Sequence, residues 1–159
     1  MIDQQVEILL VEDSPEDVEL TLHALRANHL ANRVEVVGDG EEALDYLFCR
    51  NQYSHRSLRN PPKLVLLDLK LPRVDGMEVL RQLKSSLSTK AIPVVMLTAS
   101  REEKDLIQSY HLGVNSYIQK PVDFEQFCQT VKEVGLFWLV VNQPAPQDAY
   151  IADAVTVGQ

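Results

Sequence analysis

The chain has 159 residues, 45% of them apolar and 24% charged, and a formal net charge of −8 at pH 7. This length and composition predict one globular domain with a core of its own. The negative charge argues against a protein that binds nucleic acid through its phosphates, because that function needs a basic face.

No segment indicates membrane insertion or secretion. The longest uninterrupted apolar run covers residues 136–141, which is far too short to span a bilayer, and the N-terminus lacks a basic region followed by an apolar stretch. Cys49 and Cys128 do not have the spacing of a metal or redox motif. We therefore expect a cytoplasmic protein with free thiols and no membrane partner.

Signals for strands and helices alternate five times along the chain. Short apolar runs predict strands at residues 7–11, 33–37, 64–67, 92–97 and 116–118. Apolar residues at helical spacing follow each run and mark helices at residues 18–25, 43–48, 77–87, 106–110 and 124–141. This alternation predicts an α/β fold with a mainly parallel sheet and helices on both of its faces.

Two segments lack such a period. Residues 49–62 are polar and end in two prolines, which indicates a surface loop that is long for a compact α/β domain. Residues 143–159 begin with Gln-Pro-Ala-Pro and are expected to form a tail without its own core. We therefore expect one domain over residues 1–142, followed by that tail and by no output domain.

Acidic residues stand where two of the predicted strands end. Glu12 and Asp13 follow the first strand, and Asp68 follows the third. Ligand chemistry in open α/β sheets gathers at the carboxyl ends of the strands. Three carboxylates that meet there repel one another and need a cation, and hard oxygen ligands suit Mg²⁺. Thr98 and Lys120 end the fourth and fifth runs, and they add the hydroxyl and the positive charge that an acyl-phosphate site requires.

These residues belong to motifs that together resemble the receiver domain of two-component response regulators. The resemblance extends from about residue 6 to residue 134, and the order of the motifs makes it specific. The matching motifs are Val11-Glu-Asp-Ser-Pro15, Asp68-Leu-Lys-Leu-Pro72 with Asp75-Gly76, Leu97-Thr-Ala99, and Tyr117-Ile-Gln-Lys-Pro121. The resemblance implies a doubly wound, five-stranded parallel sheet in the order 2-1-3-4-5, the flavodoxin-like receiver fold.

The resemblance also implies how the metal and the phosphoryl group are held. Asp68 resembles the phosphoacceptor. Asp13 and Asp68 would bind Mg²⁺, or Mn²⁺ as a substitute, through their carboxylates, Lys70 through its backbone carbonyl, and Glu12 through a water molecule. Glu12 departs from the commoner aspartate of the family but remains acidic.

The other matching residues would sense the phosphoryl group. Lys120 would pair with it, and Thr98 and Tyr117 resemble the switch pair, in which the hydroxyl moves onto a phosphoryl oxygen and the ring turns inward. Pro121 is expected to follow a cis peptide bond that aims Lys120.

Some acidic residues near these motifs have simpler expected roles, and one basic residue carries a hypothesis. We interpret Asp17, Asp39 and Asp75 as caps and turn formers. Lys70 lies two residues beyond Asp68. We hypothesise that its side chain modulates hydrolysis of the phosphoryl group, and an unchanged dephosphorylation rate in Lys70→Ala would contradict this.

Several features narrow the kind of regulator. Without an output domain, the chain would act as a stand-alone receiver, a signalling protein rather than a metabolic enzyme, and its partner would be a sensor histidine kinase. The long loop at residues 49–62, the apolar run at residues 136–141 and the Ser14-Pro-Glu-Asp17 segment resemble the small regulators of phytochrome-type histidine kinases.

The last predicted helix has more apolar surface than one sheet can cover. Phe137, Leu139 and Val140 lie off the stripe that ends in Trp138 and Val141. A homodimer through helix four, strand five and helix five, with Phe137, Trp138, Leu139 and Val140 on its surface, would bury the second face. Alternatively, the tail from Pro144 to Val157 covers it, or the run forms a short extra strand.

Other functions remain open at this stage. A phosphatase of the haloacid-dehalogenase kind uses a similar nucleophile, but it needs a second aspartate where Lys70 stands. A pseudo-receiver would bind partners without phosphate, although it would be expected to lack Asp13, Asp68 or Lys120. A phosphorelay intermediate would keep all of these residues. A flavodoxin-type electron carrier is disfavoured because the acidic loop after the first strand would repel a flavin phosphate.

Overall fold

A computed structural model describes residues 6–29, 33–120 and 123–146. Its five strands form one parallel sheet in the order β2-β1-β3-β4-β5, which confirms the predicted fold. The strands are β1 (Ile8–Val11), β2 (Val34–Val37), β3 (Leu64–Leu67), β4 (Val94–Thr98) and β5 (Ser116–Gln119). The helices are α1 (Pro15–Ala27), α2 (Gly40–Leu47), α3 (Gly76–Ser85), α4 (Glu103–His111) and α5 (Phe124–Leu136).

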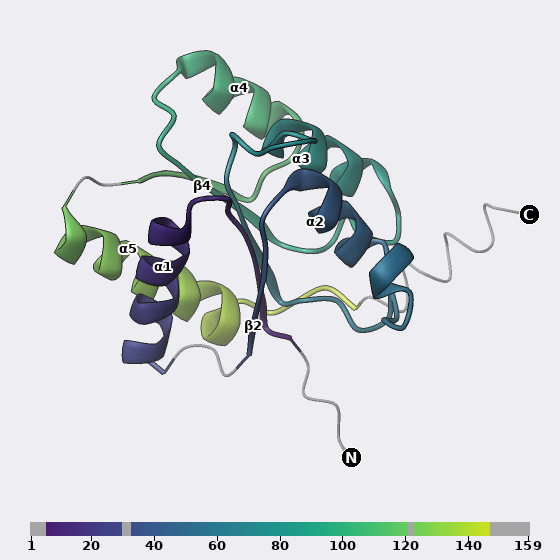
Figure 1. The fold of residues 1–159 in the computed structure, drawn as a ribbon, viewed down its shortest axis with the longest axis horizontal. Helices are drawn as coiled ribbons and strands as arrows, with labels where there is room; N and C mark the ends of the chain where they lie inside the picture. The colour runs from purple at the N-terminus through teal and green to yellow at the C-terminus, as the bar shows by residue number, and fades with distance from the viewer. Residues whose placement is uncertain (1–5, 30–32, 121–122, 147–159) are drawn as a thin grey trace, which may run out of the picture.

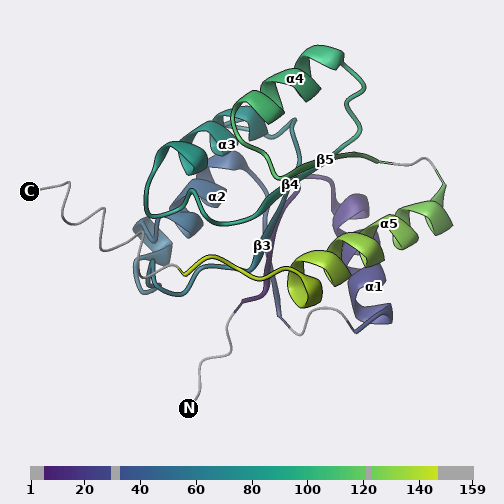
Figure 2. The same ribbon diagram turned by 180° about the vertical axis from the view of Figure 1, so that it is seen from behind.

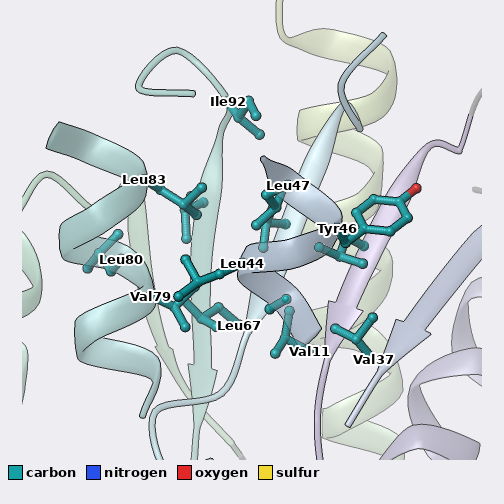
Figure 3. Close-up of a cluster of buried hydrophobic side chains, with 14 of the residues drawn as sticks. Val11, Val37, Leu44, Tyr46, Leu47, Leu67, Val79, Leu80, Leu83 and Ile92 are labelled. Atoms are coloured by element: carbon teal, nitrogen blue, oxygen red, sulfur yellow. The ribbon is translucent and has the colours of Figure 1, made fainter. Parts of the chain in front are cut away.

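The sheet separates two helical layers. Helices α1 and α5 cover one face, and α2, α3 and α4 lie over the other (Figures 1 and 2). Successive residues of a strand point to opposite faces, so each central strand supplies both cores. In β1, for example, Leu9 and Val11 join the core beneath α2 and α3, and Figure 3 shows Val11 there. Ile8 and Leu10 join the core beneath α1 and α5. All four residues are at most 2% exposed, as expected for a strand that helices cover on both faces.

Short polar side chains start the helices at the carboxyl edge of the sheet. Ser14 caps α1 by accepting a hydrogen bond from the Asp17 backbone N–H, and Asp39, Asp75 and Asp123 cap α2, α3 and α5 in the same way. The expected capping roles of Asp39 and Asp75 are therefore confirmed. The loops after β1 and β2 are short, whereas the loop after β3 covers residues 68–75.

Two segments differ from the sequence-based expectation. The loop at residues 49–62 contains a 3₁₀ helix, Asn51–Tyr53, and Tyr53 packs against the core. The last helix changes at Phe137 into a π-helical turn, Phe137–Val141, closed by a 2.6 Å hydrogen bond from Asn142 N–H to the Phe137 carbonyl. A π turn holds more residues than an α turn, so the phase of the helix shifts.

That shift changes which apolar residues face the sheet. Trp138 and Leu139 are both half-buried and pack against the core beneath α1 and α5. The expectation that Leu139 lies off the buried stripe is therefore wrong, because it assumed an unbroken 3.6-residue period. Phe137 and Val140 stay exposed. The tail as far as residue 146 has no regular structure, and no helix in the described part of the chain is long and apolar enough to cross a bilayer.

A substitution at Gly76 can test how tightly the loop after β3 is packed. A β-carbon there would lie 2.0 Å from the Asp68 carbonyl oxygen, whereas one at Gly38 would have no neighbour within 4 Å. We predict that Gly76→Ala lowers the free energy of unfolding in urea by about 1–3 kcal/mol through this backbone clash. The matched variant Gly38→Ala should change it by less than about 0.5 kcal/mol. Equal stabilities of the two variants would contradict the geometry.

Candidate functional site

Three carboxylates converge at the carboxyl edge of the sheet. Glu12 and Asp13 follow β1, Asp68 follows β3, and these strands are paired through Val11 and Leu67. One oxygen from each carboxylate lies within 4.8 Å of the others. Glu12 is buried, Asp68 is half-buried and Asp13 is exposed, so the cluster opens to solvent on the side of Asp13. Such a set of oxygen donors fits a hard divalent cation such as Mg²⁺ or Mn²⁺.

Backbone amides fix two of these carboxylates. The Leu69 N–H donates to Asp68 Oδ1 at 2.7 Å, and the Ser14 N–H donates to Glu12 Oε1 at 3.1 Å. Each carboxylate therefore has one oxygen held by its own loop. The other oxygen of each is bound by a lysine that arrives from a distant part of the chain.

That lysine is Lys120, which follows β5. Its ammonium nitrogen lies 2.7 Å from Glu12 Oε2, 2.8 Å from Asp17 Oδ2 and 3.3 Å from Asp68 Oδ2. The Lys120 backbone N–H donates to the Thr98 carbonyl at 2.7 Å, which holds this residue beside the end of β4. Its side chain is only 10% exposed, and each of its three protons can meet one carboxylate.

Asp17 is the site residue that the sequence analysis missed. The expectation that it acts as a cap is wrong, because its carboxylate binds Lys120, while Ser14 supplies the cap of α1. One feature of the sequence does indicate a place in the site, because Asp17 lies in the first turn of the helix that begins directly after Glu12-Asp13. The same position also suits a capping-box acid, so local sequence could not separate the two roles.

Burial and charge act in opposite directions within the cluster. Burial raises the pKa of Glu12 to about 7, and the nearby charge of Asp68 adds to this effect, although the hydrogen bond from Lys120 works against it. Burial alone would lower the pKa of Lys120, but its hydrogen bonds to Asp17 and Glu12 and the charge of Asp68 raise it above its ordinary value. The lysine therefore stays charged, and Glu12 can take up a proton near neutral pH.

The predicted switch residues are connected through the loop after β4. The buried Thr98 hydroxyl oxygen accepts a hydrogen bond from the Ser100 N–H at 3.3 Å, and the Tyr117 hydroxyl donates to the Ser100 carbonyl at 3.3 Å. The Ser100 hydroxyl donates to Asp105 Oδ2 on α4 at 2.6 Å. Ser100 thus links Thr98, Tyr117 and α4, a connection that the sequence analysis did not predict.

The predicted roles of Lys70 and Pro121 remain predictions. Lys70 is exposed and lines a groove of about 740 Å³ together with Glu102, Lys104 and Asp105. The metal-binding role of its backbone carbonyl stays a prediction. Pro121 and the expected cis peptide bond lie outside the described residues.

Glu12 gives the fold a specific pH dependence when divalent cations are chelated. Its folded-state pKa of about 7 is above the ordinary 4.5, so the folded protein binds the proton more tightly than the unfolded chain. We predict that this group lowers the free energy of unfolding by about 2 kcal/mol as pH rises from 4.5 to 7. Urea unfolding of the native chain and of Glu12→Gln, compared across that range, measures it. Parallel pH profiles would contradict the prediction.

Comparisons with known proteins agree with this geometry. The family model for the response regulator receiver domain matches residues 8–132. The probable methanogenesis regulatory protein FilR2 of Methanothrix harundinacea is 46% identical over 140 residues, which are 87% of this chain and 88% of FilR2. The response regulator Rcp1 of Synechocystis is 39% identical over 139 residues, covering 87% of this chain and 92% of Rcp1.

Solved structures show the same likeness. The phosphorylated cyanobacterial phytochrome response regulator RcpA has a TM-score of 0.82 and 41% identity, over 89% of this chain and 99% of RcpA. The Mn²⁺-bound form of Rcp1 has a TM-score of 0.81 and 37% identity, with the same coverage of the two chains. The chain therefore belongs to the response regulator receiver domain family of signalling proteins, whose partners are histidine kinases.

Proposed function

We propose that this chain accepts a phosphoryl group on Asp68 from a histidine kinase in the presence of Mg²⁺. The position of the Asp68 carboxylate carries the proposal. Oδ1 is fixed by the Leu69 N–H, and Oδ2 lies 3.3 Å from Lys120 beside the exposed Asp13. This geometry supports an Asp68 oxygen as the nucleophile.

The reaction follows from these groups. An Asp68 oxygen attacks the phosphorus of a phosphohistidine, the new P–O bond replaces the P–N bond, and the electron pair of that bond stays on the imidazole nitrogen. Asp13 and Asp68, the Lys70 carbonyl and Glu12 through water would hold Mg²⁺, which supplies charge neutralisation when bound. Lys120 would donate to a phosphoryl oxygen. The same groups would support slow hydrolysis of the product, so the chain acts only on its own phosphoryl group and not as a metabolic enzyme.

The phosphoryl group would change the surface through existing contacts. Lys120 has to release one of its carboxylates before it can donate to the new oxygens. The Thr98 hydroxyl can turn toward them only by leaving the Ser100 N–H, and Tyr117 can turn inward only by leaving the Ser100 carbonyl. Because Ser100 also binds Asp105, these steps would shift α4 relative to β5 and α5.

The wider pathway is part of the proposal. We infer a stand-alone cytoplasmic regulator that acts through protein contacts and binds no nucleic acid, downstream of a phytochrome-type kinase. The likeness to RcpA and the Ser14-Pro-Glu-Asp17 segment support this inference. A relay role, in which Asp68 passes the group on to another histidine, uses the same site. A phosphate-independent module is less well supported, because Asp13, Asp68 and Lys120 are all present and gathered.

Exposed apolar residues support a homodimer. Ile107 and Tyr110 on α4 are 60% and 53% exposed, and Phe137 and Val140 at the end of α5 are 48% and 67% exposed. We propose that these residues form the dimer surface, with Trp138 and Leu139 supporting it from the core side. Such an interface would bury apolar side chains that are now exposed to solvent.

Phosphorylation is tested by intact-mass measurement after incubation with acetyl phosphate and Mg²⁺. The native chain should gain one phosphoryl group, and Asp68→Asn should gain none. Asp75→Asn is a matched control, because Asp75 caps α3 at the same edge of the sheet but lies outside the cluster, and it should be modified like the native chain. A phosphoryl group on Asp68→Asn, or none on the native chain at any sampled time, would contradict the proposal.

The dimer is tested by sedimentation equilibrium at micromolar concentration. We predict that the native chain is a dimer and that the double variant Phe137→Ser/Val140→Ser is a monomer, because it removes apolar surface that association would bury. Phe124→Ser is a matched control. Phe124 is also about half exposed, at 49%, but it lies at the other end of α5. A monomeric native chain would rule out this interface.

A further inference from the structure

A second cavity lies near the amino ends of the parallel strands, far from the acidic cluster at their carboxyl ends. It has a volume of about 440 Å³ and is lined by Arg33, Glu35, Tyr46, Tyr53, His55 and Arg56, among others. Arg33 comes immediately before β2, so the cavity lies toward the amino ends of the parallel strands, whereas Glu12, Asp13 and Asp68 follow the carboxyl ends. The cavity shares no residue with the proposed phosphorylation site. Its volume is within the range of small-molecule sites.

Tyr46, one of the lining residues, has an unusual hydroxyl. Tyr46 is 2% exposed, and its hydroxyl has no hydrogen-bond partner among the described residues. Figure 3 shows the ring at the margin of the core, with its oxygen turned away from the other labelled side chains. The neighbouring Tyr53 differs, because its hydroxyl donates to Glu42 Oε1 at 2.8 Å. A buried hydroxyl without a partner costs free energy, so a ligand that accepts a hydrogen bond from it would be favoured.

Arg56 gives the cavity a fixed positive charge. Its guanidinium carbon lies 3.6 Å from the centre of the Tyr46 ring. The group donates to the carbonyl oxygens of Tyr46 and Asn60 and to Cys49 Sγ, and no carboxylate of the described residues pairs with it. These contacts hold the guanidinium in place without neutralising it.

The charges around Tyr46 favour an anion. Arg33 and Arg56 line the cavity, and Glu35 is its one acidic residue among those described. This positive concavity stands out on a chain with a net charge of −8. Burial raises the pKa of Tyr46 above its ordinary value, and the charge of Glu35 adds to this rise, whereas the charges of Arg56 and Arg33 act against it. The hydroxyl therefore stays protonated and can donate a hydrogen bond.

We propose that this cavity binds a small anionic molecule whose carboxylate or phosphate group accepts a hydrogen bond from the Tyr46 hydroxyl and lies beside Arg33 and Arg56. Glu35 favours a ligand that also carries a hydroxyl or amino donor. Such a site would let the chain respond to a metabolite as well as to a kinase. The proposal does not depend on phosphorylation of Asp68.

The test is a titration of the ¹⁵N-labelled full chain, followed by amide chemical shifts in the presence of EDTA. Inorganic phosphate and acetate are the two probes, and KCl at matched ionic strength is the blank. At least one probe should give saturable shifts at Tyr46, Arg56, Ser57 and Asn60, with none at Glu12, Asp68 or Thr98. The probe that saturates identifies whether a phosphate or a carboxylate is preferred.

Two conservative variants test the role of the hydroxyl. Tyr46→Phe should weaken binding at least tenfold without loss of the fold, since it removes only an unpaired group. Tyr53→Phe should bind like the native chain, because that hydroxyl is already used by Glu42. The proposal is overturned if neither probe gives shifts beyond those of KCl, if Tyr46→Phe binds as tightly as the native chain, or if the shifts occur at the acidic edge.

Discussion

The shared ammonium of Lys120 is the interaction on which the rest of this structure depends. It joins Glu12 after β1, Asp17 in α1 and Asp68 after β3 to the end of β5. Asp13 lies near Glu12 and Asp68 and adds a fourth carboxylate, so this edge of the sheet has more negative than positive charge. Lys120 reduces the repulsion enough for the loops to pack, and the remaining charge attracts a divalent cation. Folding and metal binding therefore draw on the same electrostatic balance.

The same interaction explains how a local reaction could reach a distant surface. A lysine has three protons, and all three are already directed at carboxylates, so a phosphoryl group has to compete for one of them. Of these three partners, Asp17 is the one that is not among the proposed metal ligands, so Lys120 can release it without disturbing them. Thr98 and Tyr117 are held in a similar way, since both bind Ser100, which is tied to α4 through Asp105. A small set of exchangeable hydrogen bonds thus connects Asp68 to the α4–β5–α5 surface.

The sequence predicted the parts of this arrangement that depend on local pattern. Apolar runs located the strands within one or two residues, and the polar residues at their ends gathered because parallel strands share one carboxyl edge. The strand order came from the family resemblance, since periodicity alone does not specify which strands pair.

The cap expected at Asp17 was wrong because a carboxylate at this position can bind either the backbone at the start of the helix or a distant lysine, and only the tertiary structure decides between them. The sequence also did not predict the π turn at Phe137 or the unpaired Tyr46 hydroxyl, because the spacing of apolar residues indicates neither of them. The environment of the Tyr46 hydroxyl depends on how residues 49–62 fold over α2.

The most direct test of this account is a crystal structure with Mg²⁺ and beryllofluoride, which mimics a phosphoryl group on an aspartate. The account predicts beryllofluoride on an Asp68 oxygen, the metal ion at Asp13 and Asp68, and the Lys120 nitrogen on a fluorine atom, with its 2.8 Å contact to Asp17 broken. A structure in which Asp68 stays unmodified, or in which Lys120 keeps all three carboxylates while Asp68 carries beryllofluoride, would contradict it.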